Sequence, residues 1–278
     1  MKMKVSVIFT TYNSVPWLEK ALWGWAAQSH KDFEIIIADD GSTKETEDKI
    51  NEIRDEFNLD VIHVWQEDNG FQKSRVLNKA ITASRCDYLI FTDGDCIPRK
   101  DFISTHIKFA EKGFFLSGGY FKLPMETSHS IRKEDIFNEY VFEVPWLVDH
   151  GLKWSYKTLK LTSEGWLEKA LNKYTPAGAP WNGHNVSGWK SDILEVNGYD
   201  ERMQYGGQDR ELGERLFNKG IKSKQIRYSA IVVHLDHARS YKTRDSVDKN
   251  LAIRAQTRKK KITWTDYGIK KLGNGEKD

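Results

Sequence analysis

The clearest pattern along the chain is a repeat of short apolar runs in its first 117 residues. These runs are rich in β-branched residues and occupy 5–9, 33–38, 61–65 and 88–92, and a fifth begins at 114. Their starts lie about 28 residues apart, a spacing that suits strand–helix–strand units and not hairpins. Because the runs are almost continuously apolar, they predict a parallel sheet covered on both faces. We therefore expect a doubly wound α/β domain.

Helical periodicity fills the intervals between these runs. Apolar residues at positions 17, 18, 21, 22 and 25 form one face of a helix that begins near Pro16, with Ser14 as its N-cap. Ser42 and Glu45 have the spacing of a capping box at the start of a second helix. Further helices are expected over 76–81, 101–112 and 164–172.

The second half of the chain follows a different pattern. Between 120 and 180 the repeat is lost and aromatic residues accumulate, and from about 251 the chain is basic and is expected to be loosely held. Residues 254–278 contain eight Lys or Arg and three Asp or Glu, so the rest has 35 basic and 37 acidic residues. A nucleic-acid-binding protein usually carries positive charge across its folded body. Because the surplus lies at the end, we expect no nucleic-acid partner.

The composition favours a cytoplasmic protein. The chain has 30% charged residues and a mean hydropathy of −0.64, and it contains no uncharged apolar run of about 18 residues that could span a bilayer. Its first residues lead into a strand-like segment and lack the apolar stretch and cleavage site of a signal peptide. Cys86 and Cys96 are too few for a disulfide framework and fit a reducing compartment.

Polar residues follow each of the first four predicted strands. They occupy 10–13, 39–42, 66–70 and 93–95. In an open parallel sheet, ligands bind beyond the carboxyl ends of the strands. Each loop alone could be an ordinary turn, but the four together predict one shared site at this edge of the sheet.

The chemistry of these loops suits a nucleotide held through a divalent cation. The chain has no GxGxxG after its first strand and no GxxxxGK[ST] motif, so the dinucleotide and P-loop modes are not expected. Asp93 and Asp95 flank Gly94 directly after an apolar strand. Hard carboxylate oxygens at such a turn select Mg²⁺ or Mn²⁺.

Two sets of motifs carry a resemblance to a known family. The segments TTYN, DDGS, QEDNGFQKSRVLNKAI and TDGD resemble, in this order, the family 2 glycosyltransferases of the GT-A fold. The segment NGHNVSGW through NKG resembles the C-terminal part of galactosyltransferases, chondroitin polymerases and polypeptide N-acetylgalactosaminyltransferases. The resemblances cover about 1–117 and 180–237. They imply a Rossmann-like, mostly parallel sheet with a nucleotide-sugar-binding half (1–118), an aromatic-rich acceptor-binding and catalytic half (119–250) and a basic tail (251–278).

The resemblance also implies which residues meet the donor and the cation. Donor contacts, in the sense of base, ribose, phosphate or sugar, are expected from Thr10, Tyr12, Asn13, Asp39, Asp40, Asn69, Arg75, Asn78, Asp93 and Gly94. Asp95 and His234 are expected to bind the metal, with His237 as the alternative histidine. An imidazole beside a carboxylate favours Mn²⁺ somewhat over Mg²⁺. Without the family, His234 would be read as an ordinary surface or core histidine.

Asp209 is the expected catalytic base of an inverting transfer from a UDP-sugar. In the resembling pattern a glycine-rich turn presents Glu-Asp, and here Gln208 replaces the usual Glu and Tyr205 the usual Trp. These departures leave the identities of the donor sugar and the acceptor open. Asp209 also opens a helix-like run over 210–219, so its alternative role is a helix cap.

The acceptor is expected to be a saccharide or glycoconjugate. Trp181, Asn182 and Gln208 are the candidate contacts, because sugar rings stack on indoles, although core packing is the alternative role for Trp181. Basic residues at 258–261, with Trp264 and Tyr267, suggest peripheral contact with an anionic membrane at its inner face, or else a solvated charge run. A nucleotidyltransferase and a catalytically inactive saccharide-binding module are the rival functions.

Overall fold

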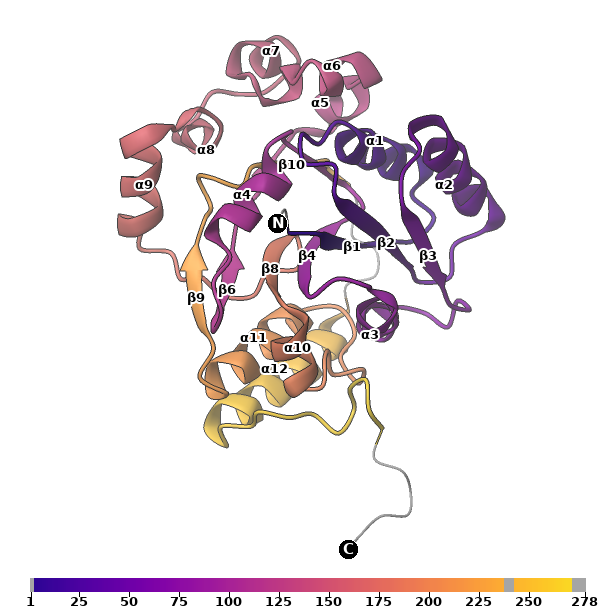
Figure 1. Cartoon of the computed structure of the whole chain (residues 1–278), viewed down its shortest axis with the longest axis vertical. Coiled ribbons are helices and arrows are strands. Elements are labelled where there is room, and N and C mark those ends of the chain that lie inside the picture. Colours follow the sequence, from indigo (N-terminus) through magenta and orange to yellow (C-terminus); the bar gives the residue numbers. More distant parts are fainter. Residues whose placement is uncertain (1–2, 238–242, 272–278) are drawn as a thin grey trace, which may run out of the picture.

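The computed structural model describes residues 3–237 and 243–271, and within them a seven-stranded sheet forms the centre of the molecule (Figure 1). Its strand order is β3-β2-β1-β4-β8-β6-β9. The strands are β1 (Val5–Thr11), β2 (Phe33–Asp39), β3 (Val61–Trp65), β4 (Tyr88–Asp93), β6 (Phe114–Ser117), β8 (Asn185–Trp189) and β9 (Lys222–Gln225). Only β8 runs antiparallel to its neighbours β4 and β6 within this sheet. The prediction of an α/β fold with a mostly parallel sheet is confirmed.

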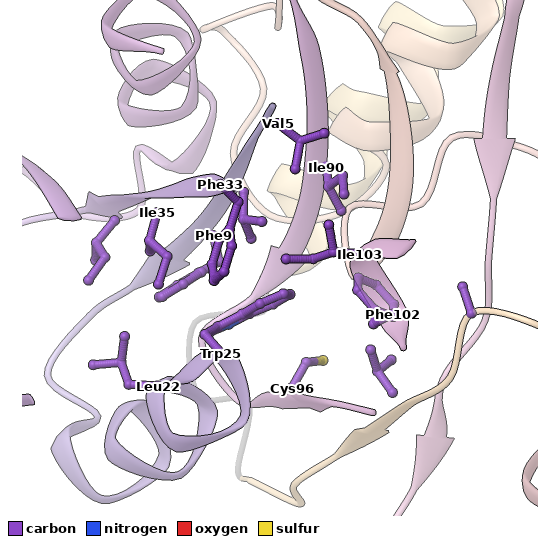
Figure 2. Packing of buried hydrophobic residues seen from close by; sticks show 14 of the residues in the cluster. Val5, Phe9, Leu22, Trp25, Phe33, Ile35, Ile90, Cys96, Phe102 and Ile103 are labelled. Atoms are coloured by element: carbon purple, nitrogen blue, oxygen red, sulfur yellow. The ribbon is translucent and has the colours of Figure 1, made fainter. Parts of the chain in front are cut away.

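Helices cover both faces of the sheet because side chains alternate along each buried strand. One face carries α1 (Val15–Ala26), α2 (Lys44–Phe57) and α4 (Phe102–Phe109), and the other carries α3 (Lys73–Ala83), α10 (Lys190–Glu195) and α11 (Gln208–Asn218). In the first core, the Trp25 ring stacks on Phe9 and meets Phe102 edge-on, with centroids 6.3 and 5.8 Å away (Figure 2). The sheet is therefore held rigidly between two apolar layers.

The helix starts differ in detail from the sequence prediction. Ser14 occupies the N-cap position of α1 but makes no side-chain cap hydrogen bond. The capping box predicted for Ser42 and Glu45 is wrong, because α2 begins at Lys44 with Thr43 as its N-cap. The Ser42 hydroxyl instead accepts a hydrogen bond from the Asn13 N–H at 2.9 Å. It therefore ties the loop after β1 to the loop after β2.

A second, smaller sheet lies beside the first. It contains β5 (Cys96–Pro98), β10 (Val232–His234) and β7 (Phe121–Lys122), in that order. Short helices lie on one side of it and form an arc along the top and left of Figure 1. They are α5 (Met125–Ser130), α6 (Lys133–Phe137), η1 (Tyr140–Phe142), α7 (Val144–Asp149), η2 (Tyr156–Thr158), α8 (Leu159–Thr162) and α9 (Gly165–Tyr174). Helix α9 confirms the helix predicted around 164–172.

The chain end is more ordered than its basic composition suggests. Helix α12 (Arg244–Lys259) packs along α11, and Thr257 and Thr265 are buried. The prediction of a loosely held segment from residue 251 is therefore wrong as far as residue 271, and the rest lies outside the described residues. No helix in the described ranges is long and apolar enough to cross a membrane.

Candidate active site

The loops at the carboxyl edge of β1, β2, β3 and β4 form one wall of a cavity of about 720 Å³, as the polar residues after these four strands predicted. Loops from the second half of the chain close it. Eleven residues singled out from the sequence line the cavity: Thr10, Tyr12, Asn13, Asp40, Asp93, Gly94, Asp95, Gln208, Asp209, His234 and His237. Residues from the two ends of this list, such as Thr10 and His237, lie far apart in the sequence but share one site.

The turn after β4 depends on Gly94. Its N–H donates to the Thr10 carbonyl at 3.0 Å. A Cβ at this position would lie 2.6 Å from the same carbonyl oxygen, well inside normal contact distance. Glycine thus allows the turn to approach β1 so closely that Asp93 and Asp95 both reach the cavity.

Asp95, His234 and His237 form a cluster suited to a divalent cation. One potential ligand atom from each residue lies within 4.8 Å of the others. His234 Nε2 lies 3.7 Å and His237 Nε2 3.1 Å from Asp95 Oδ2. One carboxylate and two imidazoles match the ligand preferences of Mn²⁺ and other first-row metals. His234 and His237 were predicted as alternative ligands, and in the structure both lie beside the carboxylate.

The small sheet explains how His234 reaches Asp95. Strand β10 pairs with β5 so that His234 lies opposite Cys96. Just beyond this pair, the Leu235 N–H donates to the Asp95 carbonyl at 2.9 Å. The histidine is thus fixed by main-chain hydrogen bonds that the sequence did not predict.

Lys73, at the start of α3, is a site residue that the sequence analysis did not single out. Its Nζ donates to Asp93 Oδ1 at 2.6 Å, and both side chains line the cavity. Burial alone would raise the pKa of Asp93, but the Lys73 charge and hydrogen bond, with smaller effects of His184 and His234, lower it to about 2. Burial works against the charge of Lys73, but Asp93 and Asp209 outweigh it and raise the Lys73 pKa. Both groups are therefore ionised at neutral pH.

Asp209 lies in the first turn of α11 at the cavity wall. Helix α11 begins at Gln208, and its N-cap is Gly207. Asp209 therefore lies inside the helix, and its alternative role as the cap is wrong. Its Oδ1 is buried and has no hydrogen-bond partner among the described residues. Burial raises the pKa of Asp209, and the nearby Lys73 charge partly offsets this effect. A buried carboxylate with a raised pKa at the wall of a cavity has the properties of a general base.

Several predicted contacts are contradicted. Trp181 is fully buried, packs edge-on against Phe91 and Phe115, and donates its N–H to the Tyr199 hydroxyl at 3.1 Å. It is a core residue and cannot stack on a sugar. Asn78 is also buried, and its amide binds the main chain of Tyr199, so it does not meet a donor.

Four further predicted contacts lie off the cavity wall: Asp39, Asn69, Arg75 and Asn182. Asp39 is buried and accepts from the Ser42 N–H at 2.8 Å, while its other oxygen pairs with His63 at 2.9 Å. Asp40 lines the cavity instead. A contact between Asp39 and the base of a nucleotide remains a prediction.

Aromatic residues complete the cavity. The Phe71 and Tyr205 rings meet edge-on at 5.8 Å, and Tyr120 meets His184 edge-on at 4.6 Å. Burial lowers the pKa of His184 to about 4, so its ring is neutral at physiological pH. Of these, Phe71 and His184 belong to the motifs QEDNGFQKSRVLNKAI and NGHN, which offered the only sequence signal for them.

The mostly parallel sheet, covered by helices on both faces and with a polar cavity at its carboxyl edge, has the architecture of the GT-A glycosyltransferases. The sequence profile described as glycosyl transferase family 2 matches residues 6–174. The chain belongs to this family.

Relatives with curated descriptions are glycosyltransferases of greater length. The uncharacterised glycosyltransferase YfnE of Bacillus subtilis is 28% identical over 90% of this chain and 69% of its own length. The validoxylamine A glucosyltransferase of Streptomyces hygroscopicus is 28% identical over 78% of this chain, which spans 52% of that protein. The hyaluronan synthase of Pasteurella multocida is 27% identical over 80% of this chain, which spans only 24% of it.

Solved structures share the fold at low sequence identity. The mannosyltransferase PcManGT of Pyrobaculum calidifontis, in complex with GDP-Man and Mn²⁺, matches 85% of this chain and 58% of its own with a TM-score of 0.58 at 19% identity. Residues 1–349 of Staphylococcus aureus TarS, in complex with UDP-GlcNAc, match 86% of this chain and 60% of that one with a TM-score of 0.58 at 15% identity.

Proposed function

We propose that this glycosyltransferase moves a hexose or N-acetylhexosamine from a UDP-sugar to a hydroxyl of a saccharide or glycoconjugate, with inversion at the anomeric carbon. One observation carries the proposal: a cation cluster of Asp95, His234 and His237 shares a single cavity with the buried carboxylate of Asp209. A cation site and a base in one cavity are what direct transfer from a nucleotide donor requires.

The donor would lie along the loops after β1, β2 and β4. Thr10, Tyr12 and Asp40 line this part of the cavity, where the base and ribose are expected. UDP is the preferred nucleotide because TarS was solved with UDP-GlcNAc, although PcManGT was solved with GDP-Man.

Asp95, His234 and His237 would hold a divalent cation, with Mn²⁺ favoured over Mg²⁺ by the two imidazoles. A bound cation would neutralise the charge that develops on the departing diphosphate. The Lys73 ammonium contributes a second positive charge to the same cavity. Paired with Asp93, it keeps that carboxylate ionised and fixed in position for the donor.

Asp209 would act on the acceptor. The Asp209 carboxylate, which lines the cavity, would accept the proton of the acceptor hydroxyl as the hydroxyl oxygen attacks the anomeric carbon. The bond from the anomeric carbon to the diphosphate oxygen breaks in the same step, which inverts the configuration. Gln208, beside Asp209 on the cavity wall, would contact the acceptor. The proposal also includes peripheral contact of the protein with a membrane through the surface near Trp264, which is partly exposed.

The proposal is tested by titrating the protein calorimetrically with UDP and with GDP, each with Mn²⁺ and with EDTA. A panel of nucleotide sugars is then screened for donor hydrolysis and for transfer to saccharide acceptors. We expect Mn²⁺-dependent binding of UDP and turnover of at least one UDP-sugar. Binding of nucleotide without any turnover would favour the inactive binding module, and release of pyrophosphate from a nucleoside triphosphate would favour the nucleotidyltransferase.

A further inference from the structure

Helix α12 contacts the turn that precedes Asp209, although it lies beyond the residues matched by the family profile. Asn250, on α12, is fully buried. Its amide nitrogen lies 3.0, 3.2 and 2.9 Å from the carbonyl oxygens of Gln204, Tyr205 and Gly206, respectively. Its amide oxygen has no partner among the described residues. The three carbonyls therefore fix the orientation of this amide.

The turn benefits from such a support because its two adjacent glycines can adopt many backbone conformations. Gly206 and Gly207 have φ values of 105° and 94°, the left-handed region that two adjacent glycines enter at little energetic cost but also leave easily. This short turn carries Tyr205 and leads directly into Gln208 and Asp209, all of which line the cavity. A shift in the backbone of the turn would therefore move Tyr205 and Gln208 on the cavity wall, and it would also move the proposed base, Asp209.

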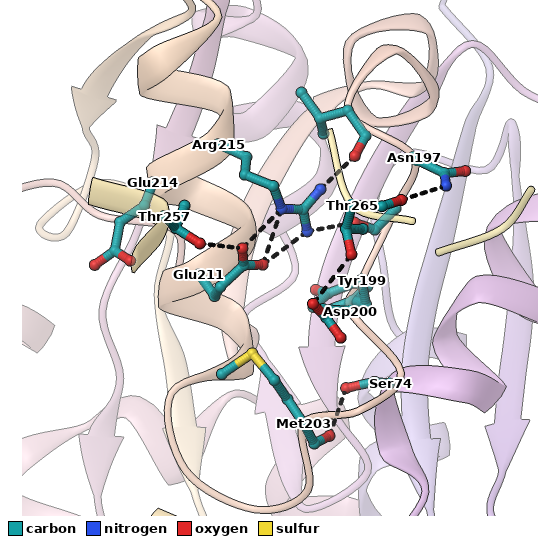
Figure 3. A network of polar contacts seen from close by, with 12 residues as sticks. Ser74, Asn197, Tyr199, Asp200, Met203, Glu211, Glu214, Arg215, Thr257 and Thr265 are labelled. Atoms are coloured by element: carbon teal, nitrogen blue, oxygen red, sulfur yellow. Dashed lines mark hydrogen bonds and ion pairs between the residues drawn. The ribbon is translucent and has the colours of Figure 1, made fainter. Parts of the chain in front are cut away.

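The rest of α12 is fixed to α11 by polar contacts. The Thr257 hydroxyl donates to the Glu211 carboxylate at 2.9 Å (Figure 3). Arg254 pairs with Glu214 at 2.6 Å. A Cβ added to Gly207 would lie 3.0 Å from Arg254 Cδ, which shows how closely α12 packs against the turn. Asn250 thus extends from a helix, α12, that is held in place by its contacts with α11.

We propose that Asn250 is a positioning residue, which holds the turn over residues 204–207 so that Asp209 faces the reacting hydroxyl. The effect on catalysis rests on the proposed function, with Asp209 as the base. The effect of Asn250 on the conformation of the turn does not depend on the proposed function. Asn250 touches neither donor nor acceptor, and it acts only through the three carbonyls of the turn.

Asn218 provides a matched control at the other end of the same helix pair. Its amide nitrogen donates to the carbonyls of Thr257 and Ile262 at 3.0 and 2.8 Å. Asn218→Ala therefore removes the same kind of amide-to-carbonyl contact without touching the turn. If Asn250 had only a structural role, both variants would lower the melting temperature and leave kcat of the folded enzyme unchanged.

The experiment compares Asn250→Ala, Asn218→Ala and the unaltered protein. We expect Asn250→Ala to lower kcat by ~10-fold to 10²-fold, the range for a small misplacement of a catalytic group, with KM for the donor almost unchanged. Asn218→Ala should retain its kcat. Hydrogen–deuterium exchange without substrate should show faster exchange over residues 204–209 in Asn250→Ala alone.

Unchanged exchange of the turn, or equal kcat values in the two variants of an active enzyme, would overturn the proposal. Absence of turnover by the unaltered protein with every donor would overturn the proposed function instead, and the exchange measurement would still decide the role of Asn250. If Asn250→Ala does not fold, Asn250→Asp takes its place. This variant keeps the shape of the side chain but removes the donor, and the same two readouts apply.

Discussion

The Lys73 ammonium lies 2.6 Å from Oδ1 of Asp93 inside the cavity, so the two residues form an ion pair within the proposed active site. The side chains are 17% and 25% exposed, which shields the pair from full screening by solvent. Lys73 also acts electrostatically on Asp209 and Asp95. One ammonium therefore balances charge among three carboxylates from different parts of the chain.

This relationship predicts a pH effect of Lys73→Met. Asp209 must be ionised to accept a proton, so kcat falls as the pH falls through its pKa. Burial raises that pKa, and Lys73 opposes the rise. Removing the ammonium should therefore move the acidic limb of the kcat–pH profile to higher pH, whereas Lys73→Arg should keep it close to its original position. A limb that stays in place in Lys73→Met would show that Lys73 does not act on the base.

Asp209→Asn should separate chemistry from donor binding. The amide keeps the shape of the side chain but cannot accept the proton of a hydroxyl. Turnover should fall ~10²-fold or more, within the range of general-base catalysis. The dissociation constant for UDP with Mn²⁺, measured by calorimetry, should change little. Full activity in this variant would remove Asp209 from the mechanism.

The cation cluster predicts that metal-dependent binding needs both histidines. His234→Ala and His237→Ala should each weaken UDP binding in Mn²⁺ by at least ~10-fold, since loss of an outer-shell group already has an effect of this size. Asp95→Ala should reduce it to the level measured in EDTA. The weaker UDP binding in EDTA serves as the common baseline. If only one histidine variant loses affinity, the other imidazole is not a ligand.

The apolar runs predicted most of the sheet because buried parallel strands need little besides continuous hydrophobicity. Strand β8 was not predicted, because Ser187 and Gly188 interrupt its apolar pattern. Both are required by their neighbours: the Ser187 hydroxyl bonds with Tyr88 at 2.8 Å, and Gly188 leaves room for the Trp181 ring. The residue types at positions 187 and 188 are therefore determined by tertiary contacts, which the sequence of a single strand does not reveal.

In the candidate site, too, some residues could be predicted from the sequence and others depend on tertiary contacts. Carboxylates after strands were predictable because the edge of a parallel sheet gathers them. Lys73 was not predictable, since a lysine near a helix start is usually solvated and its partner Asp93 lies at the end of strand β4, 20 residues further along the chain. Trp181 was assigned to the acceptor because an indole beside a loop suits either a sugar or a core. The basic chain end was wrongly predicted to be loosely held because net charge does not reveal that Thr257 and Thr265 are buried.

The polar network around Arg215, drawn in Figure 3, predicts a large loss of stability for Arg215→Met. Arg215 and Glu211 are both fully buried and paired at 2.8 Å, and the guanidinium also donates to the carbonyls of Val196 and Gly198. Removing it leaves a buried carboxylate without its cation. The free energy of unfolding should fall by about 3–5 kcal/mol, the usual effect of breaking a buried pair.

Arg258→Met is the matched control, because Arg258 pairs with Glu214 at 3.1 Å but its side chain is 55% exposed. An exposed pair of this kind contributes at most about 1 kcal/mol. The urea midpoint should therefore shift strongly for Arg215→Met and little for Arg258→Met. The double variant Arg215→Met/Glu211→Met should recover part of the loss, because it leaves no unpaired charge. If it is no more stable than Arg215→Met, the loss comes from packing and the two orphaned carbonyls rather than from the carboxylate.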